Sequence, residues 1–396
     1  MNRYVEKLHR IASGPERTII GLMSGTSMDG LDIALCRFRG SGTGTEAEIL
    51  EFTTIPFEEH VKDEVRKVFA LRTIDFQHLT LLNAWIGDLH GRLVLQALDS
   101  WGMAPDAVDA IASHGQTVFH APKILHGLPD FGNATLQIGD GDHIAVRTGI
   151  ITLSDFRQKH IAAGGEGAPL AVYGDFLLFS HPDRPRILLN IGGIANFTYL
   201  PGGHVAENVF VTDTGPGNTL LDAATRSFFP DKSYDADGKL AASGRIWPAL
   251  LQALKEDSFF VKPAPKTTGP ELFNLDYLRK AQERSGALGA SPEDLLATLT
   301  RFSAETIAET IRRAAPLWSN ADFFLSGGGA HNPVLAGHLS ELLPGREMAP
   351  FDRLGFSGDA KEALLFAVLA NETLAGGLVP FQGIPSVCMG KISFPG

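Results

Sequence analysis

The chain has 396 residues, 44% of them hydrophobic and 20% charged, which is the composition of a folded protein rather than a disordered one. This length exceeds a single ordinary core and predicts two domains. A net charge of −11 without a lysine-rich run argues against binding to nucleic acid or to an anionic membrane.

The cysteines and the start of the chain indicate the compartment. Cys36 and Cys388 lie far apart and in no metal-binding spacing, which fits a reducing environment. The first residues, MNRYVEKLHR, contain no apolar signal core, and no run of about 18 apolar residues is present to span a membrane. We therefore expect a cytoplasmic protein.

The first part of the chain predicts a group of strands. After a polar lead-in over residues 1–17, residues 18–24 and 31–38 are typical of two paired, buried strands. The dipeptide Asp29-Gly30 between them is a hairpin turn signal, and residues 47–56 predict a third strand.

Helix and strand then alternate. Apolar residues recur every three or four positions from Leu82 to Leu93, within a helical region over 60–102. Residues 110–114 and 150–155 are apolar runs typical of short strands. This alternation predicts a mixed sheet with helices, in the α/β class.

The second part of the chain repeats the opening of the first. Residues 187–191 and 194–200 predict a strand, a glycine turn and a second strand, which is a weak internal echo of a duplicated fold. A glycine-rich stretch, 162–169, separates the two parts. We place an N-terminal domain at 1–160 and a C-terminal domain at 161–375, and expect the tail 376–396 to pack back on the first.

The first candidate site is the loop between the first two strands. Glycines let backbone N–H groups approach an anion closely, and hydroxyls add donors. The loop lacks the Gly-Lys-Ser/Thr ending of a Walker P-loop, and its residues alone leave open whether it cradles phosphate or forms a plain turn. Asp29 offers Mg²⁺ an oxygen ligand, directly or through water. The candidate phosphate-binding residues are Gly25, Thr26, Ser27, Met28, Asp29 and Gly30.

A second glycine loop opens a predicted helix. In the run DTGPGN, Gly215 and Gly217 precede a helical pattern over 219–228, and a helix N-terminus presents free N–H groups to an anion. Asn218 is placed to cap that helix. Asp213 precedes the turn, where a carboxylate suits proton abstraction from a nucleophile better than phosphate binding. The alternative is that Asp213 merely caps the turn.

A third glycine run, Gly327-Gly328-Gly329, follows a strand predicted over 323–326. Such a run lets a flat group such as adenine lie against the backbone. Glycine runs are common at strand ends, so the argument for a nucleotide site comes from finding three such loops in one chain.

Polar side chains at strand ends are where sugar hydroxyls are usually held. His114 can equally be a locally bonded loop histidine. Glu362 lies in the first turn of the last predicted helix, where its charge suits the helix dipole; the alternative role is as a ligand of Mg²⁺. No G-x-S-x-G elbow or HExxH motif supports a hydrolase. The candidate substrate contacts are Ser113, His114, Gln116, Asp155 and Arg157.

These motifs resemble those of a known family. The run GLMSGTSMDGLD (21–32) is similar to the signature of anhydro-N-acetylmuramic acid kinases and of the related levoglucosan kinases. One departure is Glu166, where we expect glutamine in most muramyl kinases. The resemblance continues in one order along nearly the whole chain through ASHGQT (112–117), SDFR (154–157), AAGGEGAPL (162–170), LNIGGIANFT (189–198), DTGPGN (213–218), PKTTGPELFN (265–274), SGGGAHNP (326–333) and AKEALLFA (360–367).

The resemblance implies the fold of actin, hexokinase and Hsp70, with two ribonuclease H-like α/β lobes and a cleft between them. It implies an ATP-dependent kinase that uses Mg²⁺ and acts on a 1,6-anhydro sugar, whose O6 is tied to C1. Such an enzyme adds water at C1, opens the ether and passes the freed O6 to the γ-phosphate. By resemblance the base that activates this water is Asp213. By the same resemblance the glycine loops, the first of them with Asp29, bind ATP, and Ser113, His114, Gln116, Asp155 and Arg157 contact the sugar.

Several interpretations of function stay open. The first is a 1,6-anhydro-N-acetylmuramic acid kinase in peptidoglycan recycling that yields N-acetylmuramic acid 6-phosphate; the second is a kinase of levoglucosan or another anhydro sugar. A non-catalytic nucleotide-dependent regulator on the same fold is a third, and a plain ATPase or acetate-type kinase is a fourth. Because a pure binder does not need the carboxylate of Asp213, that residue argues against a regulator. Relatives are usually dimers, so we expect a homodimer.

Overall fold

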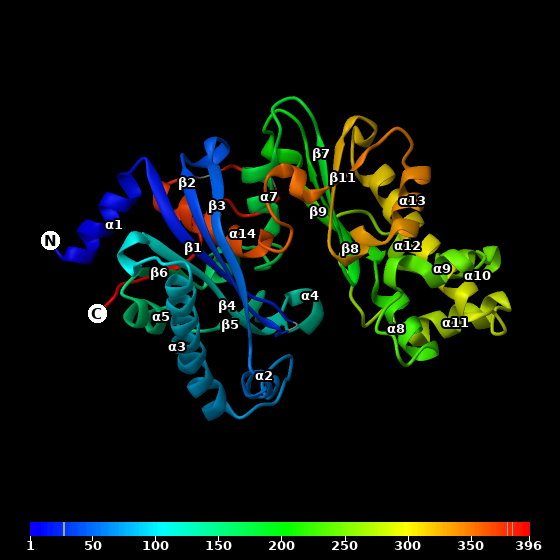
Figure 1. Cartoon of the computed structure of the whole chain (residues 1–396), viewed down its shortest axis with the longest axis horizontal. Helices are drawn as coiled ribbons and strands as arrows, with labels where there is room; N and C mark the ends of the chain where they lie inside the picture. Colours follow the sequence, from blue (N-terminus) through cyan, green and yellow to red (C-terminus); the bar gives the residue numbers. More distant parts are fainter. Residues whose placement is uncertain (27, 378, 382) are drawn as a thin grey trace. The chain divides into compact units, whose positions relative to one another are not determined.

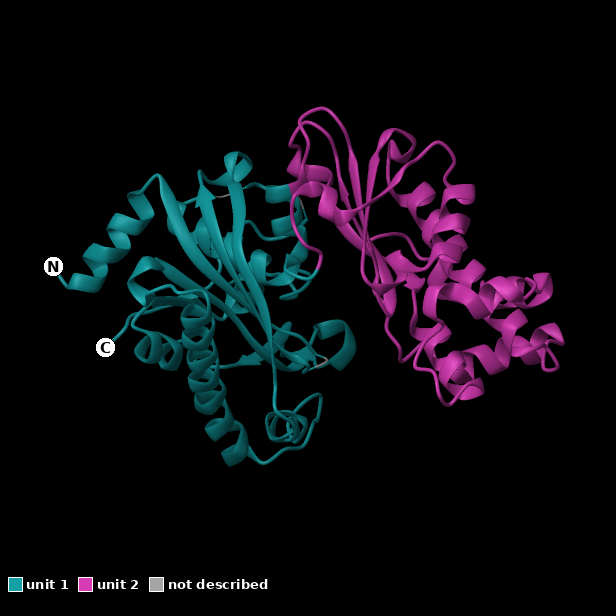
Figure 2. Cartoon of the chain, viewed as in Figure 1, with its two compact units in different colours: residues 1–178, 359–396 teal, residues 179–358 magenta. Residues whose placement is uncertain are grey.

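A computed structural model describes residues 1–26, 28–377, 379–381 and 383–396. The chain divides into two compact units, of which unit 1 comprises Met1–Leu178 and Asp359–Gly396, and unit 2 comprises Phe179–Gly358 (Figure 2). No helix within the described residues is long and apolar enough to cross a membrane.

Unit 1 is built around one mixed sheet (Figure 1), whose described strands are β1 (Glu16–Ser24), β2 (Gly30–Arg39), β3 (Glu46–Pro56), β4 (Ala110–Ala121), β5 (Ala134–Ile138), β6 (Ile151–Ser154) and β12 (Lys391–Ser393). The order across the sheet is β3-β2-β1-β4-β6-β12, with β5 paired to β4. Strands β1, β2 and β3 are antiparallel neighbours, whereas β4 runs parallel to both β1 and β6.

Helices cover both faces of this sheet; they are α1 (Arg3–Ser13), α2 (Glu59–Arg66), α3 (Phe76–Ser100), α4 (Lys123–His126), α5 (Gly141–Thr148), α6 (Phe156–Ala162), α7 (Ala171–Phe179) and α14 (Lys361–Ala375). Successive residues of a strand face opposite sides. In β1, Ile20 and Leu22 enter a core shared with Ile86 of α3. Gly21 faces α14, where an added Cβ would lie 1.9 Å from the carbonyl oxygen of Ala363. Helices α3 and α14 therefore lie on opposite faces.

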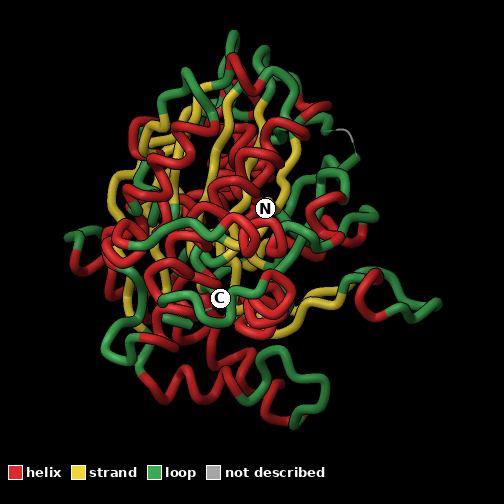
Figure 3. Tube along the Cα trace, turned by 90° about the vertical axis from the view of Figure 1, so that its right-hand side faces the viewer, coloured by secondary structure: helices red, strands yellow, loops and turns green. Residues whose placement is uncertain are grey.

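The two ends of the chain meet in unit 1 (Figure 3). The hydroxyl of Tyr4 in α1 donates to the carbonyl of Gly396 at 2.7 Å, and its ring stacks on Phe394 with centroids 6.1 Å apart. Most of residues 1–17, which the sequence predicts only as a polar segment, thus form a helix. Because Ile11 is the one buried residue of α1, the sequence has no apolar stripe that would predict this helix.

Unit 2 repeats the same strand order; its described strands are β7 (Arg186–Ile191), β8 (Ile194–Leu200), β9 (Phe210–Pro216), β10 (Asp322–Ser326) and β11 (Met348–Pro350). The order β9-β8-β7-β10-β11 matches β3-β2-β1-β4-β6. The directions match too, since β7, β8 and β9 are antiparallel neighbours and β10 is parallel to both β7 and β11. This duplicated order confirms the expected ribonuclease H-like α/β fold.

The helices of unit 2 are α8 (Thr219–Phe228), α9 (Lys239–Ser243), α10 (Pro248–Leu254), α11 (Leu275–Ser285), α12 (Pro292–Ala314) and α13 (Pro333–Leu342). Helix α12 is the long central one. Ser291 caps it by accepting a hydrogen bond from the N–H of Asp294, and Pro292 occupies its first position, where no backbone donor is needed. Ile307 and Ile311 of α12 share a core with Phe197 of β8.

The observed unit boundaries differ from the predicted ones at 160/161 and 375/376. Helices α7 and α14 belong largely or wholly to unit 1 because they pack together: Lys361 forms an ion pair with the buried Asp175 at 2.9 Å. A Cβ at Gly174 of α7 would lie 2.6 Å from the side chain of Leu365 in α14. The C-terminal tail returns to this unit through β12, which pairs with β6.

Candidate active site

The β1–β2 loop of unit 1 is exposed at its tip and anchored at its base. Thr26 and Asp29 are exposed, whereas Ser24 is buried and donates its hydroxyl to the amide oxygen of Gln116 at 2.5 Å. The amide nitrogen of Gln116 donates to the carbonyl of Gly25 at 3.3 Å. The parallel register of β1 and β4, with Ser24 opposite Gln116, brings these two predicted motifs together. Gln116 thus holds the loop, and its contact with substrate stays a prediction.

Two further residues of this loop have structural roles. Met28 has a left-handed backbone with φ of 59°, packs its side chain into the core, and donates its N–H to the carbonyl of Gly25 at 3.2 Å. A Cβ at Gly30 would lie 2.5 Å from the carbonyl oxygen of Ile55, so the close approach of β2 to β3 requires glycine there. Ser27, also predicted to contact phosphate, lies outside the described residues.

The structure brings the predicted contacts His114 and Arg157 together. The Nε of Arg157 donates to Nε2 of His114 at 2.9 Å, and Nη1 donates to the carbonyl of Gly167 at 2.7 Å. Burial, and then the charge of Arg157, hold the pKa of His114 well below its ordinary value, so this imidazole is neutral. Burial lowers the pKa of Arg157 to about 10, against a favourable effect of Glu362, so the guanidinium stays charged at neutral pH.

The other two predicted substrate contacts differ in their surroundings. The hydroxyl of Ser113 is buried and has no hydrogen-bond partner among the described residues. Asp155 has a left-handed backbone with φ of 57°, and its carboxylate pairs with the ammonium of Lys391 in β12. The C-terminal strand therefore helps to fix Asp155.

Glu362 in the first turn of α14 is influenced by the charge of Asp32 in β2, and Asp32 by that of Asp359. Burial raises the pKa of Glu362, and the charge of Asp32 raises it further. Burial likewise raises the pKa of Asp32, with Asp359 adding to the effect. Among the described residues no group of three or more His, Cys, Asp or Glu is placed to hold a metal. Mg²⁺ keeps several waters and needs only one or two carboxylates, so Glu362 and Asp32 fit it.

The sequence motifs do not single out Asp32. The signal is that Asp32 is the one carboxylate of strand β2, whose other charged residues, Arg37 and Arg39, lie at its far end. The predicted ligand Asp29 lies three residues earlier, on the exposed part of the loop. Its role in holding Mg²⁺ stays a prediction.

In unit 2 the second glycine loop docks on the turn between β7 and β8. The N–H of Gly217 donates to the carbonyl of Gly193, and the N–H of Asn218 to that of Gly192, both at 2.8 Å. A Cβ at Gly217 would lie 2.3 Å from the carbonyl oxygen of Gly192. Asn218 occupies the position before α8 without capping it, because its side-chain amide instead donates to Ile191 at 3.3 Å.

The third glycine loop meets the second at the end of β7. A Cβ at Gly327, where φ is +80°, would lie 2.7 Å from the carbonyl oxygen of Ile191, and one at Gly329 would lie 2.4 Å from the Ile191 side chain. A Cβ at Gly328 would lie 3.8 Å from the side-chain nitrogen of Asn218. Two of the three predicted glycine loops therefore form one surface of unit 2.

Helix α12 supports the second glycine loop from behind. The buried hydroxyl of Ser303 donates to the carbonyl of Gly217 at 2.9 Å. A Cβ at Gly215, where φ is +140°, would lie 3.3 Å from the hydroxyl oxygen of Thr306 and 3.0 Å from the ring of Phe260. Glycine at 215 thus satisfies both the backbone conformation and the close packing.

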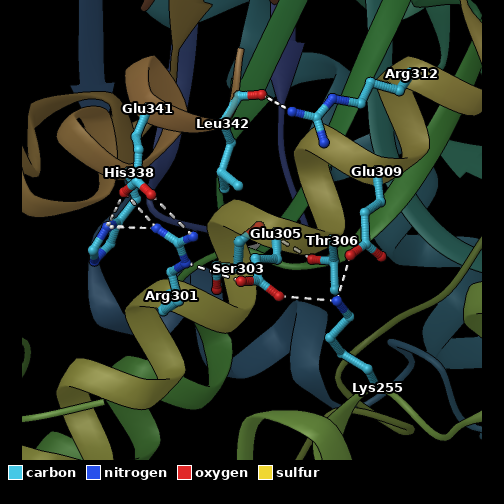
Figure 4. A network of polar contacts seen from close by, with 10 residues as sticks. All are labelled: Lys255, Arg301, Ser303, Glu305, Thr306, Glu309, Arg312, His338, Glu341 and Leu342. Carbon is cyan, nitrogen blue, oxygen red and sulfur yellow. Dashed lines mark hydrogen bonds and ion pairs between the residues drawn. The ribbon is translucent and has the colours of Figure 1, made fainter. Parts of the chain in front are cut away.

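A network of ion pairs holds α12 from another side (Figure 4). Glu305, whose side chain is 17% exposed, accepts hydrogen bonds from Lys255 and Arg301, each at 2.9 Å. Arg301 continues to Glu341 of α13 at 2.7 Å, and Lys255 continues to Glu309. Isolated ion pairs on the surface contribute little to stability, but connected and partly buried ion pairs restrict the position of the helix more strongly. The helix that carries Ser303 is therefore tied to α13.

Asp213 lies inside β9, two residues before Gly215 and thus ahead of the turn, as predicted. Its Oδ2 accepts the N–H of Thr268 at 2.8 Å, and its own N–H donates to the carbonyl of Lys266 at 2.9 Å. Burial raises the pKa of Asp213 to about 6; the bond from Thr268 and the charge of Lys266 lower it, and Glu271 raises it. A carboxylate with a pKa near neutrality is suited to act as a general base.

Three comparisons place the chain among known proteins. The sequence pattern of the family described as "Anhydro-N-acetylmuramic acid kinase" matches residues 17–388. Proteins of that name from Pseudoalteromonas atlantica and Pseudoalteromonas translucida are 54% and 50% identical to this chain, each over 100% of both sequences. Among solved structures, the chain is similar to an activator of 2-hydroxyisocaproyl-CoA dehydratase from Clostridium difficile with bound ADPNP. The match covers 91% of this chain and 96% of the activator, with 12% sequence identity and a TM-score of 0.42. On the match to the pattern and the full-length identities, the chain belongs to the anhydro-N-acetylmuramic acid kinase family.

Proposed function

We propose that the chain is an ATP-dependent kinase that opens the 1,6-anhydro ring of 1,6-anhydro-N-acetylmuramic acid and phosphorylates O6, giving N-acetylmuramic acid 6-phosphate in peptidoglycan recycling. Two full-length relatives at 50% and 54% identity carry the name of this kinase. The observation that carries the proposal is the half-buried carboxylate of Asp213, which has a pKa of about 6 and lies in unit 2 two residues before the second glycine loop.

The proposed reaction needs one base and balances as follows. Asp213 accepts a proton from water, and the water oxygen bonds to C1 of the sugar while the C1–O6 bond breaks. O6 then bonds to the γ-phosphorus of ATP, and the bond from that phosphorus to the departing ADP oxygen breaks. Because a pKa of about 6 leaves the carboxylate of Asp213 mostly ionised at pH 7, Asp213 can accept the proton from water.

We assign the glycine loops to binding ATP and the carboxylates of unit 1 to binding Mg²⁺. We assign phosphate binding to Gly25, Thr26 and Ser27 in unit 1 and to the loop 215–218 in unit 2, and the nucleoside to 327–329. The N–H groups of Gly217 and Asn218 are donated to Gly193 and Gly192, so we assign this loop to phosphate through the positive end of α8, which the loop opens, and not through those two donors. Glu362, with Asp29 or Asp32, would hold Mg²⁺, which when bound neutralises charge on the transferring phosphate.

The first test replaces the proposed base. Asp213→Asn removes the proton acceptor while keeping nearly the same volume, so we expect sugar-dependent ADP release to fall by about 10²–10⁴-fold with ATP affinity retained. Asp222→Asn is the matched control, since Asp222 is also a partly buried aspartate, in α8. Full turnover by Asp213→Asn in a coupled ADP assay would refute the assignment.

A second test follows the water. In ¹⁸O-labelled water, rapidly quenched turnover should place one labelled oxygen at C1 of the product and none in the phosphate. Product without the label would exclude ring opening by water, even if phosphorylation occurs.

The alternative substrate is levoglucosan or another anhydro sugar. The charged guanidinium of Arg157 favours the muramyl sugar, because that sugar has a lactyl carboxylate that levoglucosan lacks, and arginine pairs well with carboxylates. Comparing kcat/KM on both anhydro sugars distinguishes the two. Arg157→Gln should reduce kcat/KM for the muramyl sugar more than for levoglucosan.

Two further expectations complete the proposal: a cytoplasmic location and a homodimer. The acidic composition and the two unpaired cysteines, Cys36 and Cys388, are compatible with a reducing compartment. Light scattering of the purified chain measures its mass directly, and a mass of 42.5 kDa, that of one chain, would contradict the dimer.

A further inference from the structure

A segment of the PKTTGPELFN run lies along β9 and is hydrogen-bonded to both Thr212 and Asp213 of that strand. The N–H of Lys266 donates to the hydroxyl of Thr212 at 3.0 Å, and the N–H of Asp213 donates to the carbonyl of Lys266 at 2.9 Å. A further bond reaches the functional group itself, since the N–H of Thr268 donates to Oδ2 of Asp213 at 2.8 Å. The orientation of the carboxylate therefore depends on where this segment sits.

The side chain of Lys266 anchors the segment in an unusual way. Lys266 is only 7% exposed, whereas lysines are seldom buried without a partner. Its ammonium donates to the carbonyl of Phe259 at 2.8 Å and lies 4.2 Å from the centroid of the Phe259 ring, a cation–π contact. Among the described residues no carboxylate forms a direct ion pair with Lys266. Its positive charge is thus buried near the site without being neutralised by contact.

Charges of both signs act on Asp213. Lys266 favours the ionised carboxylate, and Glu271, an exposed residue of the same run, disfavours it. Lys266 in turn is affected by two other cations, Arg313 and Lys262, which together with burial lower its pKa to about 8. Lys266 therefore still carries its charge at neutral pH and below.

We propose that Lys266 is a positioning residue for Asp213, which fixes the segment whose Thr268 N–H orients the carboxylate and supplies the positive charge that keeps it ionised. Glu271 supplies the opposing charge. This inference rests on the proposed function, in which Asp213 is the general base. It assigns a role to the PKTTGPELFN run that neither the glycine loops nor the substrate contacts fill.

The test uses two substitutions with opposite expected signs, read from the acid limb of kcat/KM against pH. In the wild type, activity should fall as pH falls through about 6, because Asp213 becomes protonated. Lys266→Met removes a positive charge and loosens the Thr268 bond, so the limb should move to higher pH by about one unit. Glu271→Gln removes a negative charge, so the limb should move to lower pH.

Matched variants separate this role from a loss of folding. Lys266→Arg keeps the charge and should keep the wild-type limb. Lys262→Met removes a lysine that is exposed on the same stretch of chain, and should leave the limb in place. Since Glu271 is exposed, Glu271→Gln remains informative even if Lys266→Met fails to fold.

The outcomes distinguish this inference from the proposed function. Opposite shifts in Lys266→Met and Glu271→Gln support it; no shift, or shifts in the same direction, would overturn it while leaving Asp213 as the base. If instead Asp213→Asn retains full turnover, the base assignment fails and this inference fails with it.

Discussion

A single hydroxyl, that of Ser303, connects helix α12 to the carbonyl of Gly217 in the second glycine loop. Removing it leaves a buried carbonyl without this donor, which costs about 1–3 kcal/mol where no water replaces it. The N–H of the same peptide, that of Asn218, is donated to the carbonyl of Gly192 at 2.8 Å, so the two bonds together fix the position of the loop. Loss of the Ser303 hydroxyl should therefore weaken ATP binding more than it slows the chemical step.

Ser303→Ala tests this directly. We expect KM for ATP to rise by about tenfold, with kcat changed much less, since Asp213 keeps its own contacts. Ser340→Ala is the control, because Ser340 makes a comparable bond to its own helix, α13, at an exposed position. A tenfold loss of kcat at unchanged KM would contradict a role in positioning the phosphate loop.

At the residue scale, the sequence predicted where the glycine loops lie, but it did not predict all the reasons why glycine is required in them. Glycines were read as donors of N–H groups to phosphate, yet Gly30, Gly217 and Gly329 are also required because a Cβ there would strike neighbouring chain. Asp32 and Lys266 were not singled out. Their significance lies in neighbours distant in sequence, such as Glu362 for Asp32, and no local pattern encodes that proximity.

At the element scale, glycine has opposite consequences in a strand and in a helix. Gly21 of β1 lies against α14, where a Cβ would be 1.9 Å from the carbonyl oxygen of Ala363. Gly337 is exposed within α13, and a Cβ there would meet nothing within 4 Å. Glycine at position 21 is required by the close packing of β1 on α14. Glycine at position 337 has no such packing requirement and only lowers the stability of α13.

The same substitution should therefore change stability in opposite directions. Gly21→Ala should lower the free energy of unfolding by about 1–3 kcal/mol through overpacking, and Gly337→Ala should raise it by about 0.5–1 kcal/mol. Thermal unfolding followed by calorimetry measures both. Gly44→Ala, at a surface position with open space, is the control for the first. A lower midpoint for Gly337→Ala would contradict the argument for α13.

Elements with strong apolar patterns were predicted well, and so was the less buried β3, which was expected over 47–56 and begins at Glu46. Strands β1, β2, β7 and β8 matched because they are buried and continuous. Strand β9 was missed: Thr212, Asp213 and Thr214 interrupt its apolar pattern, and its last residues were assigned to the second glycine loop. It lies at the edge of its sheet, where one side has no neighbouring strand and receives the Lys266 segment instead.

At the scale of the whole molecule, the chain leaves unit 1 after Leu178 and returns at Asp359. The sequence predicted two domains and a returning tail, because length and composition bear on domain number. It misplaced the return, since nothing local to 359–375 shows that α14 packs against β1. Such long-range packing is decided by surfaces that come together only in the folded chain.

Deleting residues 391–396 tests how far the tail stabilises its unit. The deletion removes β12 and the ion pair between Lys391 and Asp155, and it leaves β6 with an exposed edge. We expect faster hydrogen exchange in β6 and in α6, with no change in β7–β9 of unit 2. Equal acceleration in both units would show that the tail stabilises the whole chain and not one unit.

The repeated strand order places two turns in equivalent positions, the β1–β2 turn of unit 1 and the β7–β8 turn of unit 2. In unit 2 the carbonyls of Gly192 and Gly193 accept the N–H groups of Asn218 and Gly217, so this turn anchors another loop of the same unit. In unit 1 Thr26 and Asp29 of the equivalent turn are exposed. The same topological position therefore tolerates a change of side chain in unit 1, whereas in unit 2 such a change also displaces the loop that is docked on it.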